Sequence, residues 1–197
     1  MFRFYLLLIF ILSAASCSLG GDPAPQDHFF RLPEIVLDVS EQSQKEIFEN
    51  VVIKPVKASG LYHERAILFI EADKPLELQR YHYSFWASTP AELIHQALIQ
   101  GLQSSGLAKL VSRNIFETRP DYIIDTRIVH FERLIDGNSA SIHIALDVSL
   151  RSGDVAGQAW NKRYVVKKKL ASMDMHTSAE AFGDGLKEIS TRLKNDL

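Results

Sequence analysis

The feature that most constrains the fold is a long hairpin pattern in the second half of the chain. Two stretches rich in β-branched and aromatic residues, 122–134 and 141–150, flank the sequence Asp136-Gly137-Asn138. These three residue types tolerate the positive φ angles that tight hairpin turns require. We therefore expect two long antiparallel strands joined by a short turn.

The turn sets the register of this hairpin and so decides which side chains share a face. If the turn consists of Asp136 and Gly137, Phe131 lies opposite Ile142 on one apolar face. The reverse face then carries four further apolar residues, Tyr122, Ile124, Ile128 and Leu134. A second half-apolar face needs another layer, a partner subunit or a lipid. We expect it to serve contact with a partner or with a second copy of the chain.

One helix is predicted in the middle of the chain. Thr89 offers an N-cap hydroxyl, Pro90 suits the first helical position, and Glu92 completes a capping box. Gly106 is placed to end the helix. An apolar stripe at helical spacing follows the cap: Leu93, Ile94, Ala97, Leu98 and Leu102.

A second helix is predicted at the C-terminus. Thr177 and Glu180 repeat the capping-box pattern, and Gly183 and Gly185 weaken the helix locally. The stripe that follows, Phe182, Leu186, Ile189 and Leu193, fits core packing against a sheet.

Short apolar runs at 51–56, 66–70 and 76–79 predict further strands. Together the elements predict an α+β fold. We expect a two-layer sandwich of a mostly antiparallel sheet with two main helices, one mid-chain and one C-terminal.

The N-terminus reads as an export signal and not as part of the fold. Residues 1–16 hold an arginine, an apolar core and the small residues that signal peptidases accept, and Cys17 follows directly. Cys17 is the only cysteine, so it can form no internal disulfide. We expect Cys17 to be lipidated, because acyl chains anchor a protein stably. The alternative is an ordinary secretory signal with an incidental cysteine.

The remaining chain is predicted to form one domain. Residues 17–28 are then the lipidated cysteine and a flexible Gly/Pro/Asp tether, and 29–197 the single domain. After the signal, no apolar run approaches the ~20 residues of a membrane span. The formal net charge of −2 gives no reason to expect a nucleic-acid partner.

The sequence offers no pattern typical of an active site. A Gly-x-Ser-x-Gly nucleophile motif is absent, and six histidines lie outside the usual metal-ligand spacings: His63, His82, His95, His130, His143 and His176. His130 and His143 would lie opposite each other in the hairpin. That pair could bind a metal, but two partly exposed imidazoles are the favoured interpretation. We predict no catalytic residue, no cofactor and no metal ligand.

Two features are candidates for contact with a partner or a lipid. Lys167, Lys168 and Lys169 continue a basic stretch that begins at Lys162 and Arg163. Such a stretch usually discourages aggregation at a solvated edge, and it could also bind anionic head groups or an acidic partner. Trp86 is the other candidate, although a tryptophan just before a capped helix is more often a core residue.

The order of several short motifs resembles a known family. After Cys17 these are Phe30-Arg31-Leu32, Lys54-Pro55-Val56, Trp86-Ala87-Ser88-Thr89-Pro90-Ala91-Glu92-Leu93, Ser105-Gly106, Asp121-Tyr122 and Phe131-Glu132. In this order and spacing the chain resembles the ABC-type transport auxiliary lipoproteins, the PqiC-like family. The resemblance covers roughly residue 29 to the C-terminus.

This resemblance implies a periplasm-facing lipoprotein tethered to the outer membrane, and Ser18 after the cysteine agrees with that destination. It implies a non-enzymatic accessory subunit beside an inner-membrane complex of a mammalian-cell-entry (MCE) protein and a permease. The system would move phospholipid between membranes, and the subunit would form a homo-oligomer. The alternative is a structural or regulatory outer-membrane lipoprotein that supports envelope integrity without transport.

Overall fold

The computed structural model describes residues 24–37, 48–113, 120–153 and 159–197. The predicted signal and Cys17 lie outside these residues. The described elements are, in chain order, β1 (His28–Phe30), β2 (Phe48–Ile53), the 3-10 helix η2 (Gly60–His63), β3 (Ala66–Glu71), β4 (Gln79–Trp86), α2 (Pro90–Ser104), β5 (Ala108–Ser112), β6 (Tyr122–Asp136), β7 (Ser139–Ser152), β8 (Ala159–Lys169) and α3 (Met175–Asp196).

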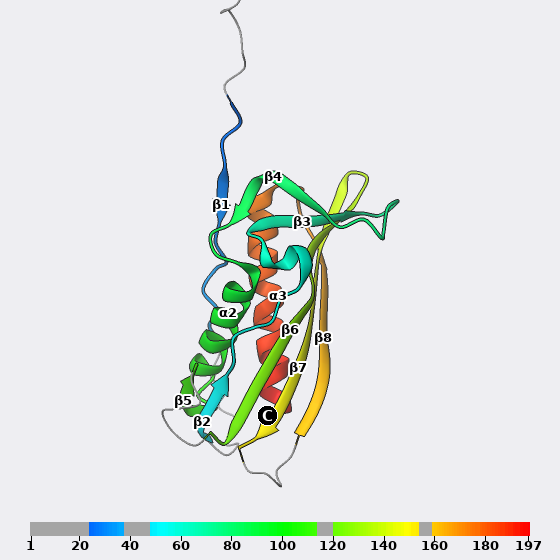
Figure 1. The fold of residues 1–197 in the computed structure, drawn as a ribbon. Coiled ribbons are helices and arrows are strands. Elements are labelled where there is room, and N and C mark those ends of the chain that lie inside the picture. The colour runs from blue at the N-terminus through cyan, green and yellow to red at the C-terminus, as the bar shows by residue number, and fades with distance from the viewer. Residues whose placement is uncertain (1–23, 38–47, 114–119, 154–158) are drawn as a thin grey trace, which may run out of the picture.

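All the strands belong to one sheet, built around the long strand β6 (Figure 1). One edge of β6 pairs with β7, which in turn pairs with β8. The other edge is shared, because β2 pairs with the start of β6 and β3 with its end. Beyond them, β5 lies beside β2, β4 beside β3, and β1 beside β4.

The α+β sandwich is confirmed, with a mixed and not a mostly antiparallel sheet. The β3–β4, β6–β7 and β7–β8 pairs are antiparallel, whereas β1–β4, β2–β5, β2–β6 and β3–β6 are parallel. Antiparallel neighbours can be joined by a tight turn, but parallel neighbours need a long crossover connection. The parallel pairs therefore join segments far apart in the chain, which local sequence patterns do not reveal.

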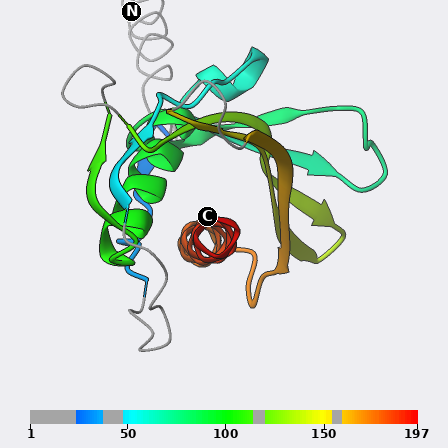
Figure 2. The ribbon, with the colours of Figure 1, turned by 90° about the horizontal axis from the view of Figure 1, so that it is seen from below.

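The two α-helices form the second layer. Figure 2 shows the sheet curving around α3, with α2 beside it. The predicted stripe of α3 is fully buried: Phe182, Leu186, Ile189 and Leu193 are each 0% exposed. Burying a side chain of this size stabilises a fold by about 1.5–3 kcal/mol. α2 approaches α3 closely at Gly101, where an added Cβ would lie 2.8 Å from the Cβ of Ser190.

The predicted start of α2 is confirmed. The Thr89 hydroxyl accepts a hydrogen bond from the Glu92 amide, and the Glu92 carboxylate accepts one from the Thr89 amide. Gly106 follows the helix with a φ of 68°. The predicted cap of α3 is wrong, because Asp174 is the N-cap and accepts from the Thr177 amide at 2.8 Å. Asp174 is itself a favoured N-cap residue and binds the amide three residues on, so the helix begins at Met175, before Thr177.

Two of the three short strand predictions are confirmed as β2 and β3. The third, at 76–79, is displaced: β4 begins at Gln79 and continues through the alternating Tyr81, Tyr83 and Phe85, and Leu76 is 100% exposed in the preceding turn. Within the described residues, no helix has the length and apolarity that a bilayer crossing requires.

The long hairpin is confirmed, but its turn and register differ from the prediction. Asp136 pairs with Ser139, so the two turn residues are Gly137 and Asn138. Gly137 has a φ of 54°, which suits the first central position of a type II′ turn. The shift is two residues, and Phe131 therefore lies opposite Ile144 instead of Ile142.

An irregularity between Ile128 and His130 changes which β6 residues face the helices. One extra residue in a strand reverses the alternation of its side chains. Ile124 and Ile128 consequently lie on the same buried face as Phe131, and all three are at most 2% exposed. The second half-apolar face that the sequence predicted does not exist. The sequence argument for a partner subunit on that face therefore does not hold.

Candidate functional site

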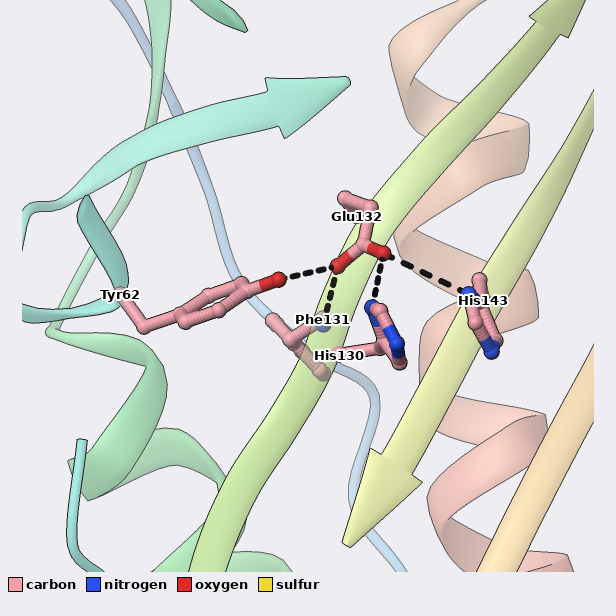
Figure 3. A network of polar contacts seen from close by, with 5 residues as sticks. All are labelled: Tyr62, His130, Phe131, Glu132 and His143. Atoms are coloured by element: carbon pink, nitrogen blue, oxygen red, sulfur yellow. Dashed lines mark hydrogen bonds and ion pairs between the residues drawn. The ribbon is translucent and has the colours of Figure 1, made fainter. Parts of the chain in front are cut away.

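The outer face of the hairpin, which points away from α3, holds a buried carboxylate. Glu132 lies on β6 and is 0% exposed. Three side chains surround it: His130 from the same strand, His143 from β7, and Tyr62 from η2 (Figure 3). We refer to Tyr62, His130, Glu132 and His143 as the Glu132 network.

One oxygen of this carboxylate is held by neutral donors. The hydroxyl of Tyr62 donates a hydrogen bond to Oε2 of Glu132 at 2.8 Å. The backbone N–H of Phe131 donates to the same oxygen at 2.6 Å. These two bonds fix the rotation of the carboxylate, so its other oxygen points toward the imidazoles, as Figure 3 shows.

The second oxygen lies between the two imidazoles. Nδ1 of His130 is 2.7 Å and Nδ1 of His143 is 3.4 Å from Oε1 of Glu132. The rings stack with 4.2 Å between their centroids and 21° between their planes. The predicted pairing of the two histidines is wrong, because β6 places His130 opposite Ala145 and Glu132 opposite His143. The imidazoles still meet, since diagonal neighbours on one face lie within reach of long side chains.

The surroundings keep the Glu132 carboxylate ionised. Burial by itself raises the pKa of a carboxyl group. Hydrogen bonding from His143 and Tyr62, with the charge of His130, outweighs the burial of Glu132, and its pKa lies below the ordinary value. Burial, followed by the charge of Glu132, raises the pKa of the Tyr62 hydroxyl. Tyr62 therefore stays a donor.

Sequence reasoning identified the two histidines but missed the carboxylate between them. Glu132 entered only as part of the family motif Phe131-Glu132. The available signal was the spacing of two along a strand, because His130 and Glu132 must then share a face. Tyr62 offers no comparable signal. It arrives from a 3-10 helix 70 residues away in the sequence.

The network brings together groups of the kinds that coordinate a cation. His130, Glu132 and His143 offer two imidazole nitrogens and a carboxylate oxygen, which are ligand types of divalent transition metals. Their ligand atoms all lie within 4.8 Å of one another. No described residue adds the serine or cysteine nucleophile of a covalent mechanism to the contacts of this network.

Trp86 is a core residue and not a surface contact. It ends β4, is 1% exposed, and packs edge-on against Phe182 at a centroid distance of 5.3 Å. Phe131 completes the cluster, 5.6 Å from Trp86. Its burial removes Trp86 from the candidate contacts with a lipid or a partner.

The lysines near the end of β8 do not form one surface. Alternation places Lys168 on the side of α3, where its Nζ lies 3.7 Å from Asp184. Lys167 and Lys169 are exposed on the outer face, Lys167 opposite His143. Within the part of the chain that the structure describes, neither has an ion pair. These two remain as candidate contacts.

The two basic residues at the start of the stretch are paired. Nζ of Lys162 lies 2.6 Å from Asp196, and Arg163 makes two bonds to Asp147 at 2.6 and 2.8 Å. Arg163 and Asp147 also line an open polar hollow of about 770 Å³ on the outer face. None of the predicted basic residues belongs to the Glu132 network.

Comparison with known proteins places this fold in a family. Residues 31–193 match the family described as the ABC-type transport auxiliary lipoprotein component. The chain belongs to that family. The match covers the described sandwich from β2 to nearly the end of α3 and leaves out only β1 and the last residues of α3 among the described elements.

Solved structures share the fold of this auxiliary lipoprotein at low sequence identity. A DUF330 protein from Xanthomonas campestris is 19% identical, with a TM-score of 0.71 over 84% of this chain and 92% of that one. A structure described as an uncharacterized protein is 11% identical, with a TM-score of 0.69 over 87% and 99%. No curated protein matches the chain.

Proposed function

We propose that this protein is a periplasm-facing lipoprotein of the outer membrane and an accessory subunit of an MCE/ABC-type lipid transport system. The observation that carries the proposal is the family match over residues 31–193, since the family is an auxiliary component of ABC-type transport. The cargo we infer is phospholipid. An inner-membrane complex of an MCE protein and a permease is the proposed partner.

The N-terminal sequence supports the membrane anchor. Cys17 directly follows the predicted export signal, and Ser18 fits an outer-membrane destination. β1 begins at His28, eleven residues after the cysteine. An extended segment of this length reaches at most about 40 Å, so the lipid would hold the domain near the membrane surface.

We propose that the domain acts by binding and not by catalysis. The buried Glu132 has four contacts that hold its carboxylate in place. A group held this firmly on a strand suits recognition or structural support. The exposed Lys167 and Lys169 are the proposed contacts for an acidic partner or for anionic head groups.

We also propose that the protein works as a homo-oligomer, as the family resemblance implies. The described outer face of the hairpin is largely polar, and an interface there would depend on charge and hydrogen bonds. Cross-linking of the full-length protein in native membranes tests this directly. A ladder of cross-linked species supports an oligomer, and a single monomer band at all cross-linker concentrations contradicts it.

Anchorage is tested by fractionation and mass spectrometry of the full-length protein expressed in a bacterial host. We expect an acylated Cys17 at the mature N-terminus and sedimentation with outer membranes. The Cys17→Ser variant should be released into the periplasmic fraction. A wild-type protein with an unmodified thiol in the soluble periplasm would contradict the anchor.

The transport role is tested by affinity purification from cross-linked cells. We expect MCE and permease subunits to copurify with the wild-type protein. The double substitution Lys167→Glu/Lys169→Glu should weaken this association, whereas Lys187→Glu on the exposed side of α3 should not. Correct anchorage without these partners would favour the structural or regulatory envelope role.

A further inference from the structure

The Glu132 network brings together three side chains that share one chemical capability. His130, Glu132 and His143 each offer one metal-ligand atom, and these atoms lie within 4.8 Å of one another. Two strands hold them in one register, because Glu132 pairs directly with His143 and His130 follows at the spacing of one face. The family assignment gives this cluster no role.

We propose that His130, Glu132 and His143 bind one divalent transition metal ion of the zinc type. The proposed ligand atoms are Nδ1 of each imidazole and Oε1 of the carboxylate. In a tetrahedral zinc site with bonds of about 2.1 Å, neighbouring ligand atoms lie about 3.4 Å apart. The observed separations from Oε1 are 2.7 Å to His130 and 3.4 Å to His143. Oε1 and His143 already have this separation, and binding would move Nδ1 of His130 about 0.7 Å farther from Oε1.

The other oxygen of Glu132 supports this geometry. Tyr62 and the Phe131 amide hold Oε2, which leaves Oε1 directed at the two imidazoles. In protein metal sites, hydrogen bonds from groups behind the ligands orient them in the same way and raise affinity. The Tyr62 hydroxyl is therefore a positioning group for the ion, reaching the carboxylate from a different part of the sheet.

The site is accessible and selective. The His130 side chain is 40% exposed and that of His143 is 12% exposed, so an ion can reach the imidazoles from solvent. Two imidazoles with one carboxylate favour zinc-type ions over magnesium or calcium, which prefer oxygen ligands. Three protein ligands leave a fourth position for water or for a ligand atom from a partner.

A bound ion would change the energetics of the buried carboxylate. It would neutralise the charge of Glu132 directly and link β6 to β7 beneath η2. An ion that binds only the folded protein stabilises it by mass action. At about a hundredfold excess over the dissociation constant, we expect the unfolding midpoint to rise by about 5–10 °C.

The test is a zinc titration of the full-length protein in detergent, purified without a histidine tag and stripped with chelator. Competition against a chromogenic chelator should give saturable binding of one ion per chain. His130→Gln and His143→Gln should each weaken binding by at least about tenfold, and Tyr62→Phe by about tenfold. His82→Ala, at an exposed histidine outside the cluster, should bind like the wild type.

A second readout does not depend on affinity. Cobalt binding should produce the visible absorption bands of a four-coordinate site in the wild type and in His82→Ala, and these should be lost in His143→Gln. Circular dichroism checks that each variant is folded, and His130→Gln retains the argument if His143→Gln unfolds. Absence of saturable binding to the wild type, or zinc binding by both His130→Gln and His143→Gln that is as tight as that of the wild type, would overturn the proposal.

Discussion

The two faces of the β6–β7–β8 sheet bury their side chains by different means. The inner face is mostly apolar where it packs against α3, with Ile142, Ile144 and Leu146 at 0% exposure, and its one buried charge there, among the described residues, is Arg133 near the start of α3. The outer face is mostly polar, yet it buries Glu132 just as completely. An apolar face needs only shape complementarity, whereas a buried charge needs a partner for each oxygen. The two faces thus show that equal burial can be stabilised by packing on one side and by hydrogen bonds on the other.

The largest expected effect is on the inner face. Ile144→Ala should lower the free energy of unfolding by about 2–5 kcal/mol, because it leaves a cavity in a tightly packed core. The packing is close, since a Cβ on Gly185 would lie 2.7 Å from Cδ1 of Ile144. Urea denaturation measures the change. Val165 lies on the outer face and is 41% exposed, so Val165→Ala should change the free energy of unfolding by no more than about 0.5 kcal/mol. Equal costs would contradict the difference between the faces.

The second effect tests the outer face. Glu132→Ala, measured with chelator present, should cost about 2–3 kcal/mol, because it removes the acceptor of the buried Phe131 amide and of Tyr62. The control is Glu64→Ala. Glu64 also has a partner, Arg80 at 2.9 Å, but its side chain is 40% exposed. An exposed ion pair contributes about 0–1 kcal/mol, so similar losses for both would show that burial of Glu132 adds nothing.

A smaller loss is expected at the edge of the same network. Tyr62→Phe removes one hydrogen bond to a charged group and should cost about 1.5 kcal/mol. Tyr83→Phe, at a tyrosine that is 47% exposed, provides the matched control and should leave the unfolding midpoint unchanged. A Tyr62→Phe variant as stable as the wild type would mean that η2 does not hold Glu132 in solution.

The smallest effect concerns pH at the end of α3. Burial tends to raise the pKa of Asp196, but hydrogen bonds from Lys162 and Tyr164 outweigh it and the pKa lies below its ordinary value. As the pH falls, Asp196 therefore becomes protonated in the unfolded chain before it does in the folded protein. The stability advantage of the wild type over Asp196→Asn is therefore present at pH 7 and declines below about pH 4. Denaturation at several pH values measures it, and a pH-independent difference would contradict it.

Local signals in the sequence were sufficient for elements that are stabilised locally. The Thr89–Glu92 capping box and Gly106 predicted α2 because their hydrogen bonds and backbone angles lie within a few residues. The long hairpin was predictable for the same reason. Its register was not, because Gly137 can occupy either position of a two-residue turn and only the assembled sheet distinguishes them.

The rest of the fold depends on contacts between distant segments. The irregularity between Ile128 and His130 has no sequence signature, yet it decides that Ile124 and Ile128 face the core. The parallel neighbours of β6 come from β2 and β3, each more than sixty residues earlier. Half of the candidate site was predictable, as the histidines show. Tyr62 completes it only after the sheet has assembled.

The shared edge of β6 has a consequence for the order in which the molecule can form. β2 and β3 obtain their inner neighbour only when residues 122–136 become available. A nascent chain that has not yet delivered this segment presents two apolar strands with free backbone groups, which invite pairing with other chains. We expect fragments that end before β6 to aggregate. The proposed export would then favour delivery of the whole polypeptide unfolded, with late, cooperative closure of the sheet.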